Sequence, residues 1–310
     1  MNAAVSIVIP VHNCGEMLIR CLESIQQQSF REFEVLIVNN GSTDGSDKIA
    51  AAFSEKDERF CLLDHPEGGA GSARNFGVSK ASGEYIAFVD GDDRLTKNYI
   101  GELYTAAKAN DADIALCGFR YYFLNTGRES RGVSMSDKVY SGEEALSLLL
   151  QDSKIKFYLW GRLFRRSLFT EHEIRIPDMY YEDAVITPQL FYYANKAVSV
   201  SGCCYLYTRA FSKYAEINMS AQRANDYINT IPLIRLFLEE QGCCRQFQGK
   251  LMHHVFHVYF AMPSIVRQCS KGNRNEDRQN LKNARTKIRL CLRCSAQKLR
   301  LLDLQKPVVK

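Results

Sequence analysis

Three carboxylates stand within four residues in the stretch FVDGDD, at Asp90, Asp92 and Asp93. An apolar run ending in Phe88 and Val89 precedes them, so the acids directly follow what reads as a buried strand. Like charges this close repel one another and raise each other's pKa. A hard divalent cation between them and an anionic ligand relieves that repulsion, and Mg²⁺ takes its remaining ligands from substrate phosphates and water. The pattern therefore predicts a metal-bound nucleotide diphosphate, although any acidic turn matches a D-x-D taken alone.

The chain around this stretch alternates between strand and helix patterns. Short apolar runs rich in β-branched residues predict strands at residues 5–10, 33–39, 60–64, 85–90 and 113–119. Helical periodicity predicts helices at residues 15–28, 46–53, 70–81 and 97–110. This alternation is typical of an α/β protein with a mostly parallel sheet and helices on both faces.

Polar loops follow the first four predicted strands, at residues 11–13, 39–44, 65–69 and 90–93. In sheets of this kind, ligands bind beyond the carboxyl ends of the strands. Each loop taken alone is also made of ordinary turn residues. Four such loops at one edge of the sheet favour a single binding site over four unrelated turns.

After the fifth predicted strand this rhythm breaks. Ser141 and Glu144 have the S-x-x-E spacing of a capping box, which predicts a helix that runs through Leu150. Residues 150–210 are rich in aromatic side chains, and from Ala221 onward the pattern is helical. We find no internal repeat and no low-complexity tract.

The composition is that of a soluble globular protein, with 46% apolar and 24% charged residues among 310. The sequence offers no secretory signal and no apolar run long enough to span a bilayer. Eleven cysteines without an export signal predict reduced thiols in a cytoplasmic protein. The C-x-x-C at Cys291 and Cys294 lacks a second pair, so zinc is not expected there. His253, His254 and His257 lack the Glu of a zinc-protease motif and are expected to pack within a helix.

The C-terminal part is strongly basic: from Arg267 to Lys310 there are 13 Lys and Arg against 3 Asp and Glu, a net charge of +10. Within it, residues 281–304 form a basic amphipathic segment. Its apolar stripe could lie on an anionic membrane surface, on the rest of the chain, or on a second subunit of a homodimer. Membrane contact would place a cytoplasmic enzyme at the inner face of the plasma membrane. No recognised nucleic-acid module is present, so we expect no nucleic-acid partner.

The segments VSIVIPVHN, VNNGSTDGS and GSARNFGVSKASGEYIAFVDGDD resemble, in order and spacing, the nucleotide-sugar domain of the family 2 inverting glycosyltransferases, which have the GT-A fold. The resemblance is dense over residues 3–120. It implies a Rossmann-like sheet flanked by helices, with a nucleotide-sugar-binding core at 1–120, an acceptor-binding part at 121–215 and a helical region at 216–310. The implied activity is transfer of a hexose or N-acetylhexosamine from a nucleotide sugar, first of all a UDP-sugar, to a glycan or lipid-linked acceptor in bacterial surface polysaccharide synthesis.

The same resemblance assigns roles to individual residues. Arg74 would meet the diphosphate or base with its planar fork, or else be a solvated surface charge. Asp90 would contact the ribose or metal-bound waters, and Asp92 would bind Mn²⁺ or Mg²⁺. Asp93 could join them or cap the helix that begins near Thr96. The implied nucleotide-sugar site is Pro10, Val11, Asn13, Asn40, Arg74, Asn75, Asp90 and Gly91, with the metal on Asp92 and Asp90.

One position departs from the family pattern. The family usually reads V-D-D-G-S or V-N-D-G-S, and its second acidic residue contacts the pyrimidine ring. Asn40 stands there in this chain. Its amide oxygen can still accept a hydrogen bond from a ring N–H, but the negative charge of the family's acidic residue is absent.

Glycosyl transfer also needs a base on the face of the sugar opposite the leaving diphosphate. The sequence YYED at residues 180–183 matches the E-D motif of the family, so Asp183 is predicted as the base and Glu182 as its neighbour on acceptor or donor hydroxyls. Both would also suit the start of a helix. Trp160 could stack on a sugar or belong to the core, and Arg209 could reach phosphates or be a surface charge.

Two other functions stay open. A nucleotidyl or phosphoryl transferase could use the same metal and nucleotide, and Glu182 and Asp183 would then have no role. A binding or scaffold protein without turnover would agree with Asn40, although the intact D-x-D and E-D motifs argue against it. Substituting Asp183 separates these readings, because a transferase would lose turnover and keep its nucleotide affinity.

Overall fold

The computed structural model describes residues 3–209, 220–269 and 274–293. These residues divide into two compact units. The first lies within Met1–Ala145, Tyr158–Asp178 and Leu190–Phe211. The second lies within Leu146–Phe157, Met179–Gln189 and Ser212–Lys310.

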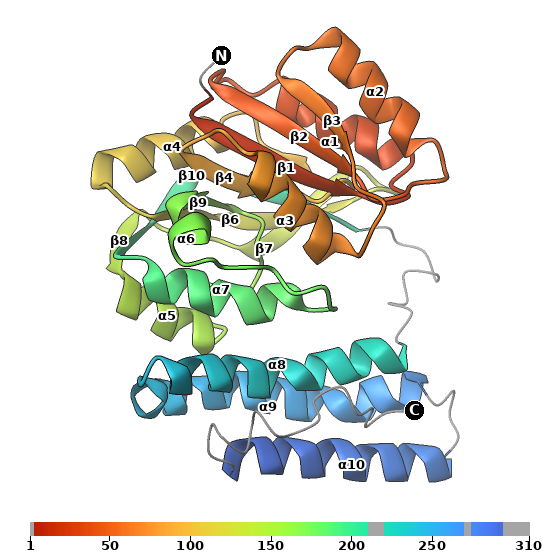
Figure 1. Ribbon diagram of the computed structural model, residues 1–310, viewed down its shortest axis with the longest axis vertical. Helices are drawn as coiled ribbons and strands as arrows, with labels where there is room; N and C mark the ends of the chain where they lie inside the picture. The colour runs from red at the N-terminus through yellow and green to blue at the C-terminus, as the bar shows by residue number, and fades with distance from the viewer. Residues whose placement is uncertain (1–2, 210–219, 270–273, 294–310) are drawn as a thin grey trace. The chain divides into compact units, whose positions relative to one another are not determined.

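The first unit is built on one mixed sheet, in the strand order β3-β2-β1-β4-β9-β6-β10-β5, with β7 paired to β6 and β8 to β10 (Figure 1). The long pairings, β1 with β2, β2 with β3, and β6 with β10, are parallel. The strands are β1 (Val5–Val11), β2 (Phe33–Asn39), β3 (Phe60–Asp64), β4 (Tyr85–Phe88), β5 (Arg94–Leu95), β6 (Ile114–Phe123), β7 (Arg128–Val133), β8 (Lys138–Ser141), β9 (Arg162–Arg165) and β10 (Lys196–Arg209).

Helices cover both faces of the parallel strands, and each agrees with a predicted segment. They are α1 (Glu16–Gln26), α2 (Ser46–Lys56), α3 (Ala70–Lys80) and α4 (Tyr99–Asn110). Alternate residues of β1, such as Ile7 and Ile9, join α1 and α4 in one buried cluster. On the opposite face, α3 lies so close to β1 that a Cβ added at Gly77 would overlap Val8 Cγ1. Glycine therefore permits the close packing of this helix.

The sheet contains five strands that the sequence analysis did not predict, namely β5, β7, β8, β9 and β10. The fifth predicted strand continues to Phe123 and forms a hairpin with β7, in the segment where the sequence analysis predicted no further strand. Because β7 is exposed along most of its length, it carries no buried pattern that would mark it as a strand. The short strand β9 also pairs antiparallel with both β4 and β6 and so lies between them. Its pairing depends on residues about 50 or more positions away.

The predicted capping box is confirmed at the start of α5 (Gly142–Leu150). The Ser141 N–H donates to Glu144 Oε2 at 2.9 Å, and the Glu144 N–H donates to Ser141 Oγ at 3.2 Å. These reciprocal bonds satisfy two backbone donors that the helix itself cannot. Two further helices follow, α6 (Ser167–Glu171) and α7 (Glu182–Tyr193).

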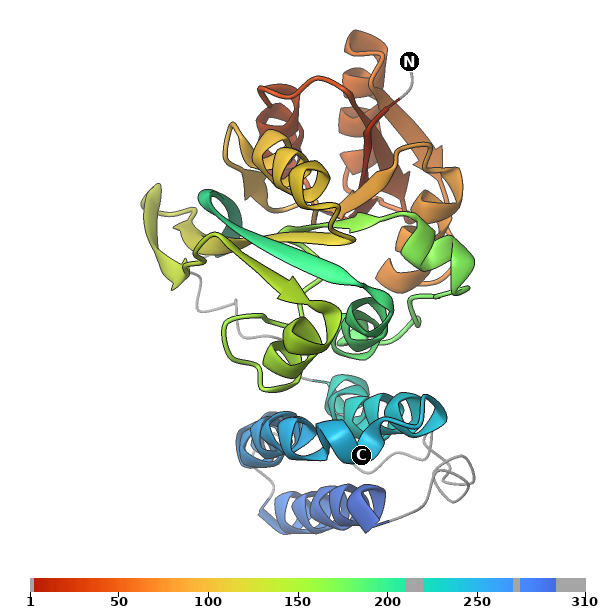
Figure 2. The same cartoon turned by 90° about the vertical axis from the view of Figure 1, so that its left-hand side faces the viewer.

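The second unit contains three long helices that lie side by side, α8 (Ala221–Glu240), α9 (Cys244–Cys269) and α10 (Arg274–Arg293) (Figures 1 and 2). His254 of α9 is buried among them, as expected. His253 and His257 are exposed, so the expectation that they also pack inside is wrong. His257 Nδ1 instead lies 2.9 Å from Asp152 Oδ2. No helix in the described part of the chain is both long and apolar enough to cross a membrane.

The apolar stripe of the basic segment 281–304 is partly described, and it turns inward. Ala284 and Ile288 are buried, and α10 packs against α8 and α9. The stripe thus packs within its own unit in this part, while residues 294–304 lie outside the described residues. The opposite side of α10 carries exposed basic side chains at helical spacing, namely Arg274, Arg278, Lys282, Arg289 and Arg293. Arg285 instead lies over the Tyr259 ring of α9, 5.2 Å from its centre.

Candidate active site

The loops after β1 and β2 are tied together by short polar contacts. Asn13 has a left-handed φ of 53°, and its Oδ1 accepts a hydrogen bond from the Thr43 N–H at 2.8 Å. His12 Nδ1 lies 2.7 Å from the backbone oxygen of Asn40. Pro10 and Val11 form the end of β1 directly before these contacts. The two loops therefore form one polar edge, as the strand pattern predicted.

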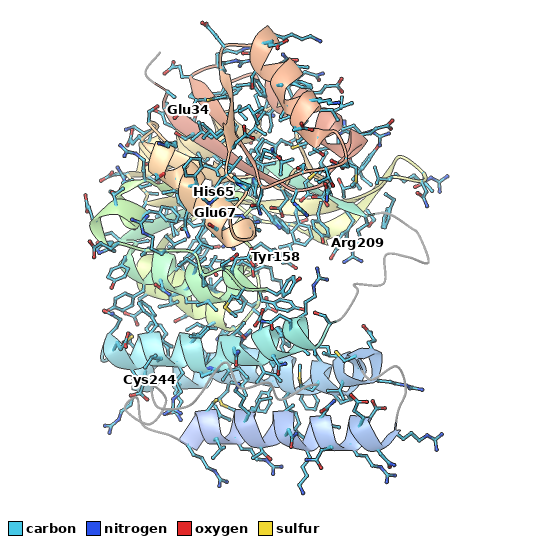
Figure 3. All side chains as sticks on the ribbon, turned by 45° about the vertical axis from the view of Figure 1, so that its right-hand side comes forward. Glu34, His65, Glu67, Tyr158, Arg209 and Cys244 are labelled. Carbon is cyan, nitrogen blue, oxygen red and sulfur yellow. The ribbon has the colours of Figure 1, made fainter. Side chains whose placement is uncertain are left out.

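The loop after β4 belongs to the same edge. A Cβ added at Gly91 would come within 2.9 Å of Cys14 Sγ and 3.6 Å of Val11 Cγ2. Glycine at this position lets the DGDD loop approach the end of β1 and the start of α1. The third loop, after β3, joins the end of β2, since the His65 N–H donates to the Asn39 backbone oxygen at 2.9 Å, and the Gly69 N–H donates to Asp178 Oδ1 at 2.8 Å. His65 and Glu67 mark this third loop in Figure 3.

Asn40 presents an unusual polar group at this edge. Its side chain is 9% exposed, and its Oδ1 is buried with no hydrogen-bond partner among the described residues. A buried acceptor without a partner costs free energy that a donor on a ligand would recover. The residue that departs from the family pattern thus carries a buried hydrogen-bond acceptor without a partner among the described residues.

Arg74 is a partner of the DGDD loop and not a surface charge. It is 7% exposed, and its Nη2 lies 2.8 Å from Asp90 Oδ1. Its neighbour Asn75 makes a reciprocal pair with the backbone of Ile176, donating to the oxygen at 2.8 Å and accepting from the N–H at 2.9 Å. Asn75 therefore fastens residue 176 to α3, a structural task that the sequence pattern did not indicate, and its contact with a nucleotide stays a prediction.

The three aspartates of the DGDD loop have three different environments. Asp93 is fully buried, and it accepts hydrogen bonds from the Tyr205 hydroxyl at 2.8 Å and from the Thr208 N–H at 2.7 Å. The same hydroxyl accepts from the Asp90 N–H at 3.1 Å. The alternative that Asp93 caps the next helix is wrong, because both oxygens of its carboxylate accept hydrogen bonds from residues of β10.

Burial and mutual repulsion dominate the electrostatics of this loop. Loss of hydration, followed by the charges of Asp92 and Asp90, raises the pKa of Asp93 well above its ordinary value. Asp92 is exposed as a residue, yet the protein packed around its carboxylate reduces its hydration. That effect and the charge of Asp90 raise the pKa of Asp92 to about 6. The loop thus holds more negative charge than its neighbours neutralise.

A divalent cation fits this donor set. Asp90 and Asp92 offer hard oxygen ligands, and a cation beside them would offset the repulsion that raises the pKa of Asp92. In the described part of the chain, no group of three or more His, Cys, Asp or Glu side chains could hold a metal ion. Mn²⁺ or Mg²⁺ here would therefore need further ligands from a diphosphate and water.

Trp160 lies in a stack of tyrosine rings beside the core. Its ring is nearly parallel to those of Tyr158 at 4.2 Å, Tyr205 at 4.6 Å and Tyr207 at 5.5 Å. Tyr158 remains 36% exposed (Figure 3). Sequence reasoning singled out Trp160 alone and none of its three tyrosine neighbours. Arg209 is exposed, with its guanidinium 4.3 Å from the centre of the Tyr121 ring. An exposed aromatic ring can stack on a sugar face, and an exposed arginine can bind a phosphate.

Glu182 and Asp183 belong to the second unit and form the first turn of α7. Tyr181, directly before them, has a left-handed φ of 62° and packs its ring 4.6 Å from that of Tyr227. The Ala184 N–H donates to Asp183 Oδ1 at 2.8 Å. The expectation that the two acids begin a helix is confirmed, and acids in a first turn are favoured by the helix dipole.

Comparison with known proteins gives a consistent result. The sequence profile of the family described as Glycosyl transferase family 2 matches residues 6–173. The chain is 28% identical to the uncharacterized glycosyltransferase YibD of Escherichia coli K12 over 278 residues, which cover 88% of this chain and 80% of YibD. It is 31% identical to glycosyltransferase GlyA of Streptococcus pneumoniae over 215 residues, 66% of this chain but only 30% of GlyA's length.

Among solved structures, the chain is similar to TarS of S. aureus in complex with UDP-GlcNAc. The TM-score is 0.68 at 20% identity, over 96% of this chain and 91% of the other. At this identity the likeness shows the fold, and it confirms the α/β GT-A architecture with a helical C-terminal region that the sequence predicted.

Proposed function

Because the chain belongs to glycosyl transferase family 2, we propose that it moves a sugar from a nucleotide-diphosphate sugar to a hydroxyl of a glycan or lipid-linked acceptor, with inversion, in bacterial surface polysaccharide synthesis. The observation that carries this proposal is the acidic loop at the end of β4, where Arg74 pairs with Asp90 at 2.8 Å beside the raised pKa of Asp92. Excess negative charge at a strand end suits a cation and a diphosphate.

The donor would lie along the edge formed by the loops after β1, β2 and β4. Pro10, Val11 and Asn13 would contact the base and ribose, and the unpaired Oδ1 of Asn40 would accept a hydrogen bond from a ring N–H. Uracil carries such an N–H, and the complex of TarS with UDP-GlcNAc supports a UDP-sugar as the first donor to screen. Both hexoses and N-acetylhexosamines belong in that screen.

Asp92 and Asp90 would hold Mn²⁺ or Mg²⁺, and Gly91 would let the loop approach the diphosphate. A bound divalent cation supplies stabilisation of the negative charge that develops on the leaving diphosphate. Arg74 orients Asp90 through their ion pair. Its guanidinium adds a positive charge, besides that of the cation, close to the leaving diphosphate. These residues thereby bind and orient the leaving group.

Asp183 would accept the proton of the acceptor hydroxyl as its oxygen bonds to the anomeric carbon, while the bond from that carbon to the diphosphate breaks. Glu182 would hydrogen-bond hydroxyls of the acceptor or donor. The acceptor sugar would stack on Tyr158, at the exposed end of the stack that includes Trp160, with Arg209 close to the donor phosphates. A single displacement of this kind inverts the configuration at the anomeric carbon.

The basic side of α10 supports contact with an anionic membrane surface at the inner face of the plasma membrane. Since Ala284 and Ile288 are buried within the second unit, this contact would be electrostatic and not an insertion of the apolar stripe. Sedimentation with vesicles that contain phosphatidylserine should fall steeply between 0.1 and 0.5 M salt, about threefold or more. Equal sedimentation with neutral vesicles would contradict the electrostatic contact.

Thermal unfolding with nucleotides tests the donor proposal. The protein is heated with UDP, GDP, CDP or ADP, each with and without Mn²⁺, beside the variant Asp92→Ala. A ligand at about 100 times its Kd should add about 2.7 kcal/mol to the free energy of unfolding. We expect that gain for UDP with Mn²⁺ and its loss in Asp92→Ala. If no nucleotide stabilises the protein, the transferase proposal fails and a scaffold function takes its place.

A further inference from the structure

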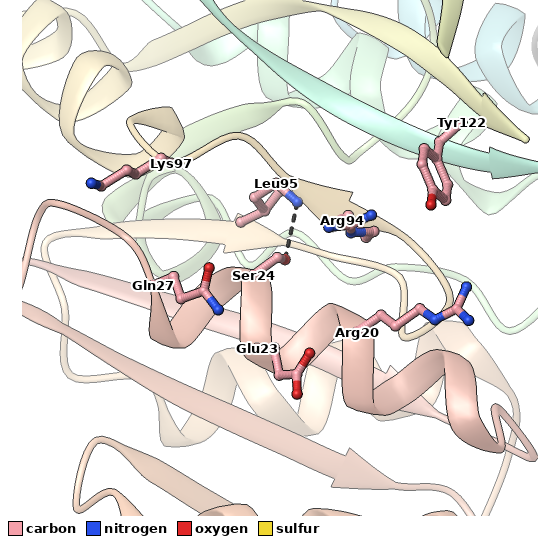
Figure 4. Close-up of a pocket in the computed structure, with 8 residues that line it drawn as sticks. All are labelled: Arg20, Glu23, Ser24, Gln27, Arg94, Leu95, Lys97 and Tyr122. Atoms are coloured by element: carbon pink, nitrogen blue, oxygen red, sulfur yellow. Dashed lines mark hydrogen bonds between the residues drawn. The ribbon is translucent and has the colours of Figure 1, made fainter. Parts of the chain in front are cut away.

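A second polar pocket of about 250 Å³ opens beside the acidic loop, between α1 and the β5 region (Figure 4). Its polar lining comes from Arg20, Glu23 and Gln27 on α1, from Arg94 and Lys97 at and after β5, and from Tyr122 on β6. All six belong to the first unit. None of them is part of the proposed donor site, so a ligand here would be a different group from the donor diphosphate.

The charges in this pocket favour an anion. The lining contains three cationic side chains, those of Arg20, Arg94 and Lys97, and one carboxylate, that of Glu23. Figure 4 shows Arg20, Arg94 and Tyr122 towards one end of the pocket and Lys97 towards the other. Within the part of the chain that the structure describes, Arg20 and Lys97 make no side-chain hydrogen bond or ion pair. The positive charge is therefore not used to hold the protein together.

Arg94 is the most informative residue of the pocket. It is half-buried, and its Nε is buried without a hydrogen-bond partner among the described residues. Arg59 and Arg165 of the same unit each have a carboxylate partner, Asp57 at 2.7 Å and Asp113 at 2.9 Å, whereas Arg94 has no ion-pair partner among the described residues. An unpaired buried donor on a charged group is costly unless a ligand accepts from it.

The fold holds Arg94 in place for such a ligand. Its guanidinium lies 5.0 Å from the centre of the Tyr122 ring, which fixes the plane and leaves the N–H groups at its edge free to donate. The Leu95 N–H donates to Ser24 Oγ at 3.1 Å and fastens β5 to α1 (Figure 4). A planar fork with free donors is the arrangement that recognises phosphate oxygens.

We infer that this pocket binds a phosphoryl group carried by the acceptor. Arg94 directly follows Asp93, and Cα atoms two residues apart lie within about 7.6 Å of each other, so the pocket adjoins the loop where the donor diphosphate is proposed to bind. A phosphorylated molecule held so close to the donor is the other substrate. The acceptor assignment rests on the proposed function, whereas the affinity for a phosphoryl group does not.

The test measures binding of sn-glycerol 3-phosphate, inorganic phosphate and glycerol to the full chain by ³¹P NMR or calorimetry, with and without UDP and Mg²⁺. Arg94→Gln and Arg20→Gln should each raise the Kd for glycerol 3-phosphate about tenfold, because each removes a hydrogen bond to a charged group. Lys97→Gln should raise it only about twofold, because Lys97 lies towards the other end of the pocket from Arg20 and Arg94. Lys56→Gln, an exposed lysine on α2, is the matched control and should leave the Kd unchanged.

Each outcome decides a separate point. Tighter binding of glycerol 3-phosphate than of inorganic phosphate supports an acceptor group, whereas equal binding identifies a free-anion site and overturns the acceptor assignment. Binding that none of the three pocket variants weakens, or no binding, overturns the pocket. Arg20 is exposed, so Arg20→Gln keeps the test decisive if Arg94→Gln fails to fold. If the protein binds glycerol 3-phosphate but does not bind UDP, the proposed function is contradicted and the phosphoryl site is still supported.

Discussion

The two acidic motifs of this chain are held in different ways. In the first unit, the DGDD loop is fastened by residues far along the chain, since Asp93 bonds to Tyr205 and Thr208 and Asp90 pairs with Arg74. In the second unit, Glu182 and Asp183 form the first turn of their own helix. The buried Asp93 is thus fixed by contacts from distant parts of the chain, whereas Glu182 and Asp183 are positioned by the start of a helix. Removing a partner of Asp93 should therefore affect folding, and a substitution at Asp183 should affect activity.

The largest effect is expected at Asp183, where Asp183→Asn removes the proposed base and keeps the shape of the side chain. We expect kcat to fall about 10²- to 10⁴-fold, the usual contribution of a general base, with the affinity for UDP and Mn²⁺ unchanged. Sugar transfer is measured beside nucleotide binding. Glu143→Gln, an exposed acid in the first turn of α5, is the matched control and should keep full activity. Full activity in Asp183→Asn would remove this residue from the mechanism.

The next effect concerns the fold of the first motif. Tyr205→Phe removes a buried hydroxyl that donates to Asp93 and accepts from the Asp90 N–H. Because both groups lose a buried partner, the free energy of unfolding should fall by about 3 kcal/mol.

Urea unfolding at pH 7 measures this change. The control is Tyr207→Phe, since Tyr207 stacks in the same cluster, and it should stay within about 0.5 kcal/mol of the wild type. If Tyr205→Phe were as stable as the wild type, Asp93 would not depend on β10, and the contrast between the two motifs would disappear.

The sequence predicted the fold well where strands and helices alternate locally. The runs at 33–39 and 60–64 and the capping box at Ser141 and Glu144 each appear as predicted, because apolar periodicity and capping act over a few residues. The strand β9 was missed because RLFR is four residues long and pairs with strands elsewhere in the chain. Short strands of this kind depend on tertiary contacts that no local pattern records.

The candidate site shows the same limit. The spacing in DGDD indicated an acidic cluster at a strand end, but not which aspartate does what. The task of Asp93 depends on Tyr205 and Thr208, which lie 112 and 115 residues further along the chain. No sequence pattern indicated a role for Arg94, because a single arginine after an acidic loop is common. Only the structure shows that its Nε has no hydrogen-bond partner and that its guanidinium lies over the Tyr122 ring.

The smallest predicted effect concerns the second unit, through its buried histidine. His254 Nε2 lies 2.8 Å from Thr230 Oγ1, and its ring is 4.8 Å from that of Phe157. Burial, followed by the charge of His257 on the same helix, lowers the pKa of His254 from 6.5 to about 4. The acid beside these histidines is Asp152, whose carboxylate lies 2.9 Å from His257 Nδ1. The folded unit therefore keeps His254 neutral where the unfolded chain would already bind a proton.

The direction of the change in stability with pH follows from the number of protons that each state binds. Between pH 6.5 and about 4 the unfolded state binds more protons at His254 than the folded state, so stability falls as the pH falls through this window. From pH 7 to pH 5 this site should cost about 2 kcal/mol in the free energy of unfolding. Urea unfolding at both pH values measures it, and His254→Gln should lose that part of the pH dependence, whereas His257→Gln, an exposed histidine on α9, should keep most of it. An equal pH dependence in wild type and His254→Gln would mean that the histidine is charged in the folded state, and the second unit would then tolerate a buried charge as the first unit does.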